Sequence, residues 1–159
     1  AMFYLPDGIA PWSDQLVWRV TGLLRELHGF DSAREAVVVG RLELSPVLDK
    51  RVAELSKGYR RRLLLALALL TPQPILILDE PFDGFDLRQT LHVMDLLREV
   101  AIDRALILSI HQLKDAERIC DRLLLLDGGR RLGFGTMGEL ASQAGAARAD
   151  LEEVFLGLT

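Results

Sequence analysis

One stretch decides the fold, residues 75–86, which reads Ile75-Leu76-Ile77-Leu78-Asp79-Glu80-Pro81-Phe82-Asp83-Gly84-Phe85-Asp86. Its first four residues are all aliphatic, which is typical of a strand buried on both faces of a parallel sheet. Two carboxylates, Asp79 and Glu80, follow where this strand should end. Ligands of open α/β sheets bind at the carboxyl ends of parallel strands. The pair therefore predicts either a ligand site or a solvated turn in which Asp86 caps the next helix.

Composition narrows the classes of protein to consider. A chain of 159 residues fits one domain of ordinary size. The net charge of −4 and the pI of about 5.4 give no support for nucleic-acid binding. A single cysteine, Cys120, excludes a disulfide framework and is compatible with a reducing cytoplasm. No apolar run approaches the roughly 18 residues that a membrane-spanning helix needs.

Residue patterns divide the chain into two kinds of structure. Residues 12–70 are mostly helical in pattern, whereas a short strand at 2–5 and the alternating strands and helices of 71–159 are typical of an α/β core. These include a second buried strand at 105–110 and a hairpin turning at Asp127-Gly128-Gly129. We therefore expect an α/β fold with a helical subdomain, about 12–70, set against a core formed by 2–6 and 71–159.

Four motifs carry a resemblance to a known family. They are Leu55-Ser56-Lys57-Gly58-Tyr59, residues 75–80, residues 83–86 and His111. In order and approximate spacing they resemble the ATP-binding domain of ABC transporters, a P-loop NTPase-like fold, and the tail at 150–156 resembles the bacterial multidrug and efflux branch. The resemblance implies an ATP-binding subunit of an exporter. It would couple ATP hydrolysis to transport through a transmembrane permease, and would lie on the cytoplasmic face of the cell membrane.

The resemblance also assigns roles at the end of the central strand. Asp79 would hold Mg²⁺ through water, and Glu80 would polarise the water that attacks ATP. His111 ends the next strand at the same sheet edge, where a histidine would contact the γ-phosphate. Asp7 occupies the position at which the family usually places a Gln that contacts Mg²⁺. An acidic residue there can meet the metal through water.

A second group of residues is expected to bind phosphate. Ser56, Lys57 and Gly58 begin a helix, whose N–H groups and dipole favour an anion. In the family this loop binds the γ-phosphate held by the opposite subunit, so the active dimer is head-to-tail. Asp83 and Asp86 match the loop that lies across that dimer interface.

The chain departs from the family pattern in this region. Lys57 and Tyr59 replace a Gly and a Gln of the family motif, and Lys57 requires a negative φ. Three arginines, residues 60–62, then stand where cations oppose the helix dipole, and phosphate or nearby acids could offset them. We expect at least two of the three to form a solvated basic face. The loop at 7–18 would place an exposed Trp12 toward the permease, and a tryptophan of the core is the competing interpretation.

The phosphate-cradling motif G-x-x-x-x-G-K-[ST] does not occur in these 159 residues. In the family, an antiparallel subdomain that stacks adenine precedes this motif, and the resemblance finds no counterpart of it in the sequence. We therefore expect the chain to correspond to the C-terminal two-thirds of such a domain. We expect it to bind ATP weakly on its own and not to turn it over. Uncovered sheet edges and apolar surface also predict self-association.

Two other functions share some of these features. A degenerate, non-catalytic module that only dimerises or docks would keep the motifs without their chemistry. A chromosome-maintenance or DNA-repair ATPase would need a long coiled-coil insertion before the signature, and residues 7–55 leave no room for one. The acidic pI also argues against DNA as a ligand.

Overall fold

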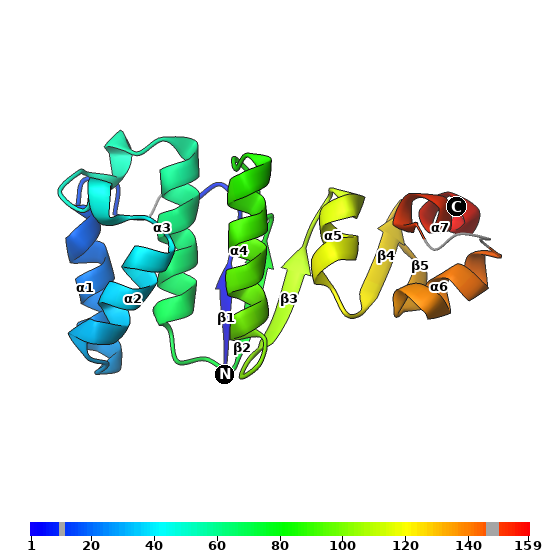
Figure 1. The fold of residues 1–159 in the computed structure, drawn as a ribbon, viewed down its shortest axis with the longest axis horizontal. Helices are drawn as coiled ribbons and strands as arrows, with labels where there is room; N and C mark the ends of the chain where they lie inside the picture. Colours follow the sequence, from blue (N-terminus) through cyan, green and yellow to red (C-terminus); the bar gives the residue numbers. More distant parts are fainter. Residues whose placement is uncertain (10–11, 146–149) are drawn as a thin grey trace. The chain divides into compact units, whose positions relative to one another are not determined.

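The computed structural model describes residues 1–9, 12–145 and 150–159, which form two compact units, 1–109 and 110–159 (Figure 1). The first unit contains a parallel sheet of three strands, β1 (Met2–Leu5), β2 (Ile75–Asp79) and β3 (Ala105–Ser109). Their order is β1-β2-β3, so the decisive stretch forms the central strand. The carboxyl ends of β1 and β2 lie side by side, because Leu5 pairs with Leu78.

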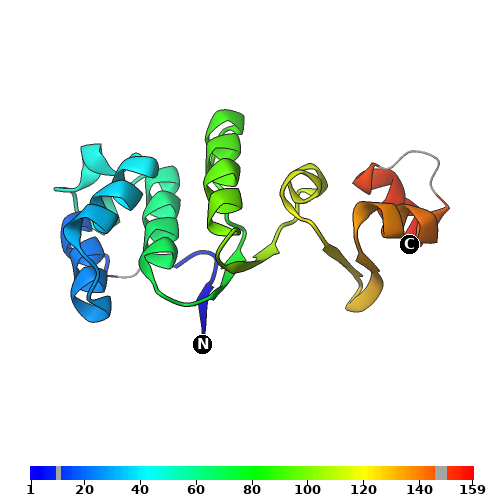
Figure 2. The same ribbon diagram turned by 60° about the horizontal axis from the view of Figure 1, so that its bottom comes forward.

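Helices of the first unit come mostly between β1 and β2. They are α1 (Val17–His28), α2 (Ser32–Arg41), α3 (Lys57–Leu70) and α4 (Leu87–Val100), with short 3₁₀ turns η1 (Ser45–Val47) and η2 (Val52–Glu54). Helices α1, α2 and α3 pack together, and α3 also contacts β1 (Figures 1 and 2). Among the described residues, no helix combines the length and apolar composition that crossing a bilayer requires.

The first two helices of this unit begin after well-defined turns and caps. Helix α1 begins at Val17, after a turn in which the N–H of Gln15 donates to the carbonyl of Trp12. Trp12 has a φ of +50° and is 46% exposed, so the interpretation as a core tryptophan is wrong. Helix α2 begins at Ser32 and is capped by Asp31, whose carboxylate accepts the Arg34 N–H at 2.8 Å.

The core of the first unit lies between one face of the sheet and the helices. Leu76 and Leu78 of β2 are fully buried, as are many side chains of α3 and α4. Burying one such side chain contributes about 1.5–3 kcal/mol. The fully buried side chains from these helices include Leu63, Leu65, Leu70, Met94 and Leu97.

The opposite face of this sheet is largely exposed within the described residues. Burial alternates along β2, where Ile75 and Ile77 are only partly buried, and Ile107 of β3 is 55% exposed. The expectation of strands buried on both faces is therefore wrong for β2 and β3. Helices of this unit cover a single face, so period-two alternation governs burial even though both faces carry aliphatic side chains.

The second unit packs three helices on a hairpin. It contains α5 (Leu113–Ile119), β4 (Leu123–Asp127), β5 (Arg130–Gly135), α6 (Met137–Ala144) and α7 (Leu151–Leu158). The predicted hairpin is confirmed, with Gly128 and Gly129 at positive φ in the turn. Cys120 is half-buried beside the apolar core of this unit, and burial raises the pKa of its thiol. Its position fits a structural thiol rather than a nucleophile.

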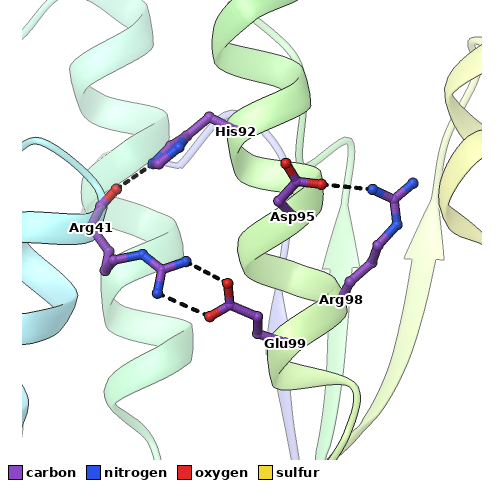
Figure 3. Close-up of polar contacts among 5 residues, drawn as sticks. All are labelled: Arg41, His92, Asp95, Arg98 and Glu99. Atoms are coloured by element: carbon purple, nitrogen blue, oxygen red, sulfur yellow. Dashed lines mark hydrogen bonds and ion pairs between the residues drawn. The ribbon is translucent and has the colours of Figure 1, made fainter.

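A polar link joins α2 to α4 (Figure 3). The Arg41 guanidinium donates two hydrogen bonds to the Glu99 carboxylate, at 2.9 and 2.8 Å. One helical face of α4 also presents His92, whose Nε2 lies 2.7 Å from the Arg41 carbonyl at the C-terminal end of α2. These contacts connect the group of helices before β2 with the helix that follows the decisive stretch.

This link predicts a specific dependence of stability on pH. The hydrogen bonds from Arg41 hold the pKa of the Glu99 carboxyl below its ordinary value. The resulting stabilisation is present above the unfolded pKa of about 4.3 and is lost as the pH falls through the lower folded value. We expect Glu99→Gln to lower the free energy of unfolding near neutral pH and to flatten its loss in acid, measured by urea unfolding.

The matched control is Asp95→Asn. Asp95 lies on the same helix but pairs with Arg98 of that helix, so its replacement removes one acid without breaking the link to α2 (Figure 3). Equal effects of both replacements on the acid limb would show that the link between helices does not contribute.

Candidate functional site

Asp79 and Glu80 lie where β2 ends, as the sequence predicts. The Glu80 N–H donates to the Ser109 carbonyl at 3.0 Å, which extends the pairing with β3 by one residue. The Glu80 carbonyl then accepts the Asp83 N–H at 3.1 Å and closes a turn. Glu80 has a φ of +48°, a left-handed conformation that costs a residue with a side chain about 1–2 kcal/mol. Such strain is frequent at functional sites.

The turn at residues 83–86 continues directly into α4. Gly84 has a φ of +86°, and the side chain of Phe82 is buried. Asp86 is the N-cap of α4: its carboxylate accepts the Gln89 N–H at 2.9 Å, while the Gln89 side chain accepts the Asp86 N–H at 3.3 Å. The expected cap at Asp86 is therefore confirmed; together with Gln89 it forms a capping box, which fixes the direction of the chain after β2.

Helix α3 begins at the predicted signature motif. Ser56 is its N-cap, and the hydroxyl oxygen of Ser56 accepts the Tyr59 N–H at 3.3 Å. Lys57 is the first helical residue and does not have a positive φ, so the substitution of Lys for Gly fits this backbone. The remaining N–H groups of the first turn and the positive end of the helix dipole can receive an anion.

The start of α3 touches the 83–86 turn. The Lys57 Nζ lies 2.7 Å from a carboxylate oxygen of Asp83. A Cβ on Gly58 would lie 3.4 Å from the Gly84 carbonyl, and a Cβ on Gly84 would meet the Lys57 side chain at 3.0 Å. Two of the four motifs are thus in direct contact, next to the end of β2. Gly84 is required for the positive φ of this turn, whereas a Cβ on Gly58 would make an ordinary van der Waals contact.

The arginines after the signature motif do not form a solvated face. Arg61 is only 5% exposed; it donates to the Asp79 carbonyl at 3.3 Å and pairs with the Asp7 carboxylate. Arg62 pairs with Glu43 at 2.6 Å and is mostly buried. The expectation of at least two solvated arginines is wrong, because acids from other segments balance these cations. The position of Arg61 within an apolar helix was the signal that could have revealed its burial.

The two remaining candidates lie in different surroundings. Asp7 follows β1, and the hydrogen bond from Arg61 holds the pKa of its carboxyl below the ordinary value. His111 is exposed in the second unit, just before α5, so its approach to the carboxylates of β2 stays a prediction. The described residues contain no group of three or more His, Cys, Asp or Glu side chains that could hold a metal.

The contact between the two motifs predicts the cost of a methyl group at Gly84. We expect Gly84→Ala to lower the free energy of unfolding by about 1–2 kcal/mol, because alanine disfavours this φ and its Cβ meets Lys57. Gly40→Ala is the control: Gly40 lies in α2 with no atom near an added Cβ, so the same change should be neutral or stabilising. Urea unfolding measures both, and a neutral Gly84→Ala would contradict the close contact.

Comparisons of sequence and of structure with known proteins indicate the same family. A profile of the family described as ABC transporter matches residues 13–83. Nod factor export ATP-binding protein I of Rhizobium meliloti is 40% identical over 105 residues, which are 64% of this chain and 31% of that protein. Daunorubicin resistance ATP-binding protein DrrA3 of Streptomyces coeruleorubidus is 36% identical over 120 residues, 75% of this chain and 38% of that protein. The chain spans about a third of the length of these relatives.

A solved structure extends the likeness over nearly the whole chain. It is described as the ATP-binding subunit of an ABC transporter and superposes with a TM-score of 0.86 at 28% identity, covering 99% of this chain and 68% of that one. The expected α/β fold of the P-loop NTPase type, with helices flanking a parallel sheet, is thereby confirmed. Motifs, fold and relatives agree, and the chain belongs to the family of ABC transporter ATP-binding domains.

Proposed function

We propose that this chain is part of the ATP-binding subunit of an ABC exporter, which couples ATP binding and hydrolysis to transport through a transmembrane partner. The contact between the start of α3 and the 83–86 turn, next to Asp79 and Glu80, carries this proposal. It gathers an anion-binding helix end and two carboxylates in one region of the first unit. The names of the two relatives, one for export and one for drug resistance, support the direction of transport.

The carboxylates suit a reaction on a metal-bound phosphate. Mg²⁺ is typically held by one or two carboxylates together with substrate phosphates and water, so Asp79 can suffice without a dedicated cluster of ligands. When bound, the ion neutralises charge on the β- and γ-phosphates of ATP. Glu80 follows Asp79 directly and would orient and polarise the attacking water. His111, two residues after the end of β3, would contact the γ-phosphate.

The signature residues would act on a second nucleotide site. Ser56, Lys57 and Gly58 would bind the γ-phosphate held by an opposite ATP-binding subunit, in a head-to-tail dimer. Because Lys57 is paired with Asp83, its charge would contribute less to phosphate binding than the helix N–H groups. Asp83 and Asp86 would lie at the same dimer interface. The subunit would lie on the cytoplasmic face of the membrane, against its permease.

The chain on its own should bind nucleotide weakly, because the motif G-x-x-x-x-G-K-[ST] does not occur in its sequence. Calorimetric titration with ATP and Mg²⁺ tests this, and micromolar affinity would contradict it. The wider proposal is tested by purifying the membrane assembly that contains this chain and measuring ATP hydrolysis. An assembly that neither binds nor hydrolyses ATP would overturn the exporter function.

The exposed sheet face favours one alternative, a non-catalytic module that dimerises. Met2 is 62% exposed, and Tyr4 and Ile107 of the same face are more than half exposed. An apolar face of a parallel sheet is normally covered, and a second copy of this chain could cover it. Light scattering over a range of concentrations distinguishes the two: a monomer at every concentration would remove this alternative.

A further inference from the structure

Arg61 is a buried charge near the start of α3. It is 5% exposed, and the helix continues with the fully buried residues Leu63 and Leu65. Removing a guanidinium from water costs several kcal/mol unless partners replace the lost hydration. The partners of Arg61 therefore show what this charge does in the fold.

Both partners come from the carboxyl ends of neighbouring strands. The Nη1 of Arg61 donates to the backbone carbonyl of Asp79, at the end of β2, at 3.3 Å. Its Nη2 donates to the carboxylate of Asp7, two residues after the end of β1. The planar fork of arginine can bond two acceptors in fixed directions, which a lysine ammonium does not reproduce.

We propose that Arg61 is a positioning residue that holds the loop after β1 against the end of β2. Arg61 lies in α3 and bonds the backbone that precedes Glu80. Its second partner, Asp7, lies in the loop after β1. As far as the reaction is concerned, this inference rests on the proposed function. The link between helix and strand ends is a property of the chain itself and can be tested without nucleotide.

Two backbone amides report on the end of β2. The N–H of Glu80 is bonded to the Ser109 carbonyl, and the N–H of Asp83 is bonded to the Glu80 carbonyl. Local opening of this segment would expose both amides to hydrogen exchange. In the full chain, Arg61→Met should accelerate exchange at both amides by about tenfold or more, because the Asp79 carbonyl loses its side-chain donor.

The matched control is Arg62→Met. Arg62 is the next residue of the same helix and is mostly buried; its ion-pair partner Glu43 lies outside the strand ends, and its guanidinium lies 6.0 Å from the centre of the Phe85 ring. Because Phe85 belongs to the turn that contains Asp83, the control is read at Glu80, where Arg62→Met should leave exchange unchanged relative to other amides of the sheet. If Arg61→Met and Arg62→Met accelerate the Glu80 amide equally, Arg61 contributes only general stability and the inference is wrong.

Two further variants keep the test decisive if Arg61→Met does not fold. Asp7→Asn changes a partly exposed side chain and should accelerate exchange in the loop after β1 more than at Glu80. Arg61→Lys keeps the charge but bonds one acceptor, so it should restore only part of the protection. Full protection with Lys, or no effect of Asp7→Asn, would contradict the two-acceptor link.

Kinetics separates this inference from the proposed function. In the membrane assembly, Arg61→Lys should lower kcat by about tenfold while the KM for ATP stays within about twofold, since Arg61 touches the strand ends and not the phosphate-binding turn. A drop in kcat with an equal rise in KM would contradict positioning. An assembly without any ATPase activity would end the proposed function, whereas the exchange results would still decide the role of Arg61.

Discussion

Glu80→Gln should reduce the kcat of ATP hydrolysis by about 100-fold or more in the assembly that contains this chain. Glutamine keeps the size and the hydrogen-bonding reach of the side chain but cannot accept a proton or polarise water as a carboxylate does. The KM for ATP should change little, because Glu80 would act on the water and not on the anchors of the nucleotide. Steady-state hydrolysis over a range of ATP concentrations measures both constants.

The backbone around Glu80 explains why the effect should be large. The N–H and C=O of Glu80 are both engaged, by Ser109 and Asp83, so the position of the residue is fixed from two sides. Its φ of +48° is retained at an energetic cost, which the surrounding hydrogen bonds offset. A side chain held in this way can keep a water molecule oriented. A neighbouring side chain without this fixed backbone could not take over the same role.

Glu43→Gln is a closely matched control for this experiment. Glu43 is also a glutamate with positive φ, at +52°, but it follows α2 and pairs with Arg62. The same chemical change in the same backbone region should leave kcat within about twofold of the unchanged protein. If both variants lose activity equally, the loss reflects stability; if neither does, Glu80 has no role in hydrolysis.

Much of this site could be predicted because its signals are local. An aliphatic run followed by carboxylates predicts a strand end, and Asp86 with Gln89 predicts the capping box that starts α4. Ser56 likewise predicts the start of α3. Each of these features depends on residues within a few positions of one another, so the chain pattern alone contains the relevant contacts.

The left-handed backbone of Glu80 could not be predicted in this way. Pro81 follows it, and a residue before proline is normally extended. Here the chain must both extend the β2–β3 pairing to Ser109 and turn at once toward Asp83, and these bonds override the local preference. The partner Ser109 is distant in sequence, so no local pattern predicts the positive φ of Glu80.

The burial of the charged residues 60–62 could not be predicted from the local sequence either. In sequence they are a basic run at a helix start, for which a solvated face is the ordinary expectation. In the fold, Arg61 meets Asp7 and Arg62 meets Glu43, both from other segments. Burial of a charge depends on partners that only the tertiary structure brings together. The same applies to β3, whose aliphatic pattern does not reveal that one of its faces lacks a cover.

Leu76→Ala should lower the free energy of unfolding of the first unit by about 2–5 kcal/mol. Leu76 is fully buried in the central strand and pairs with Phe3 and Leu106 on either side. Truncation removes its apolar contacts and leaves a cavity between the sheet and the helices. Because β2 is flanked by paired strands, the surrounding backbone can move little to fill that space. Denaturant unfolding followed by circular dichroism measures the loss.

Ile107→Ala is the control from the opposite face of the same sheet. Ile107 pairs with Ile77 but is 55% exposed, so its truncation should cost within about 1 kcal/mol. A loss as large as that of Leu76→Ala would contradict an uncovered face and mean that another surface packs on it in solution. If a second copy of the chain supplies that surface, the cost of Ile107→Ala should shrink on dilution, whereas the cost of Leu76→Ala should not. Unfolding curves at two protein concentrations therefore distinguish burial inside one chain from burial between chains.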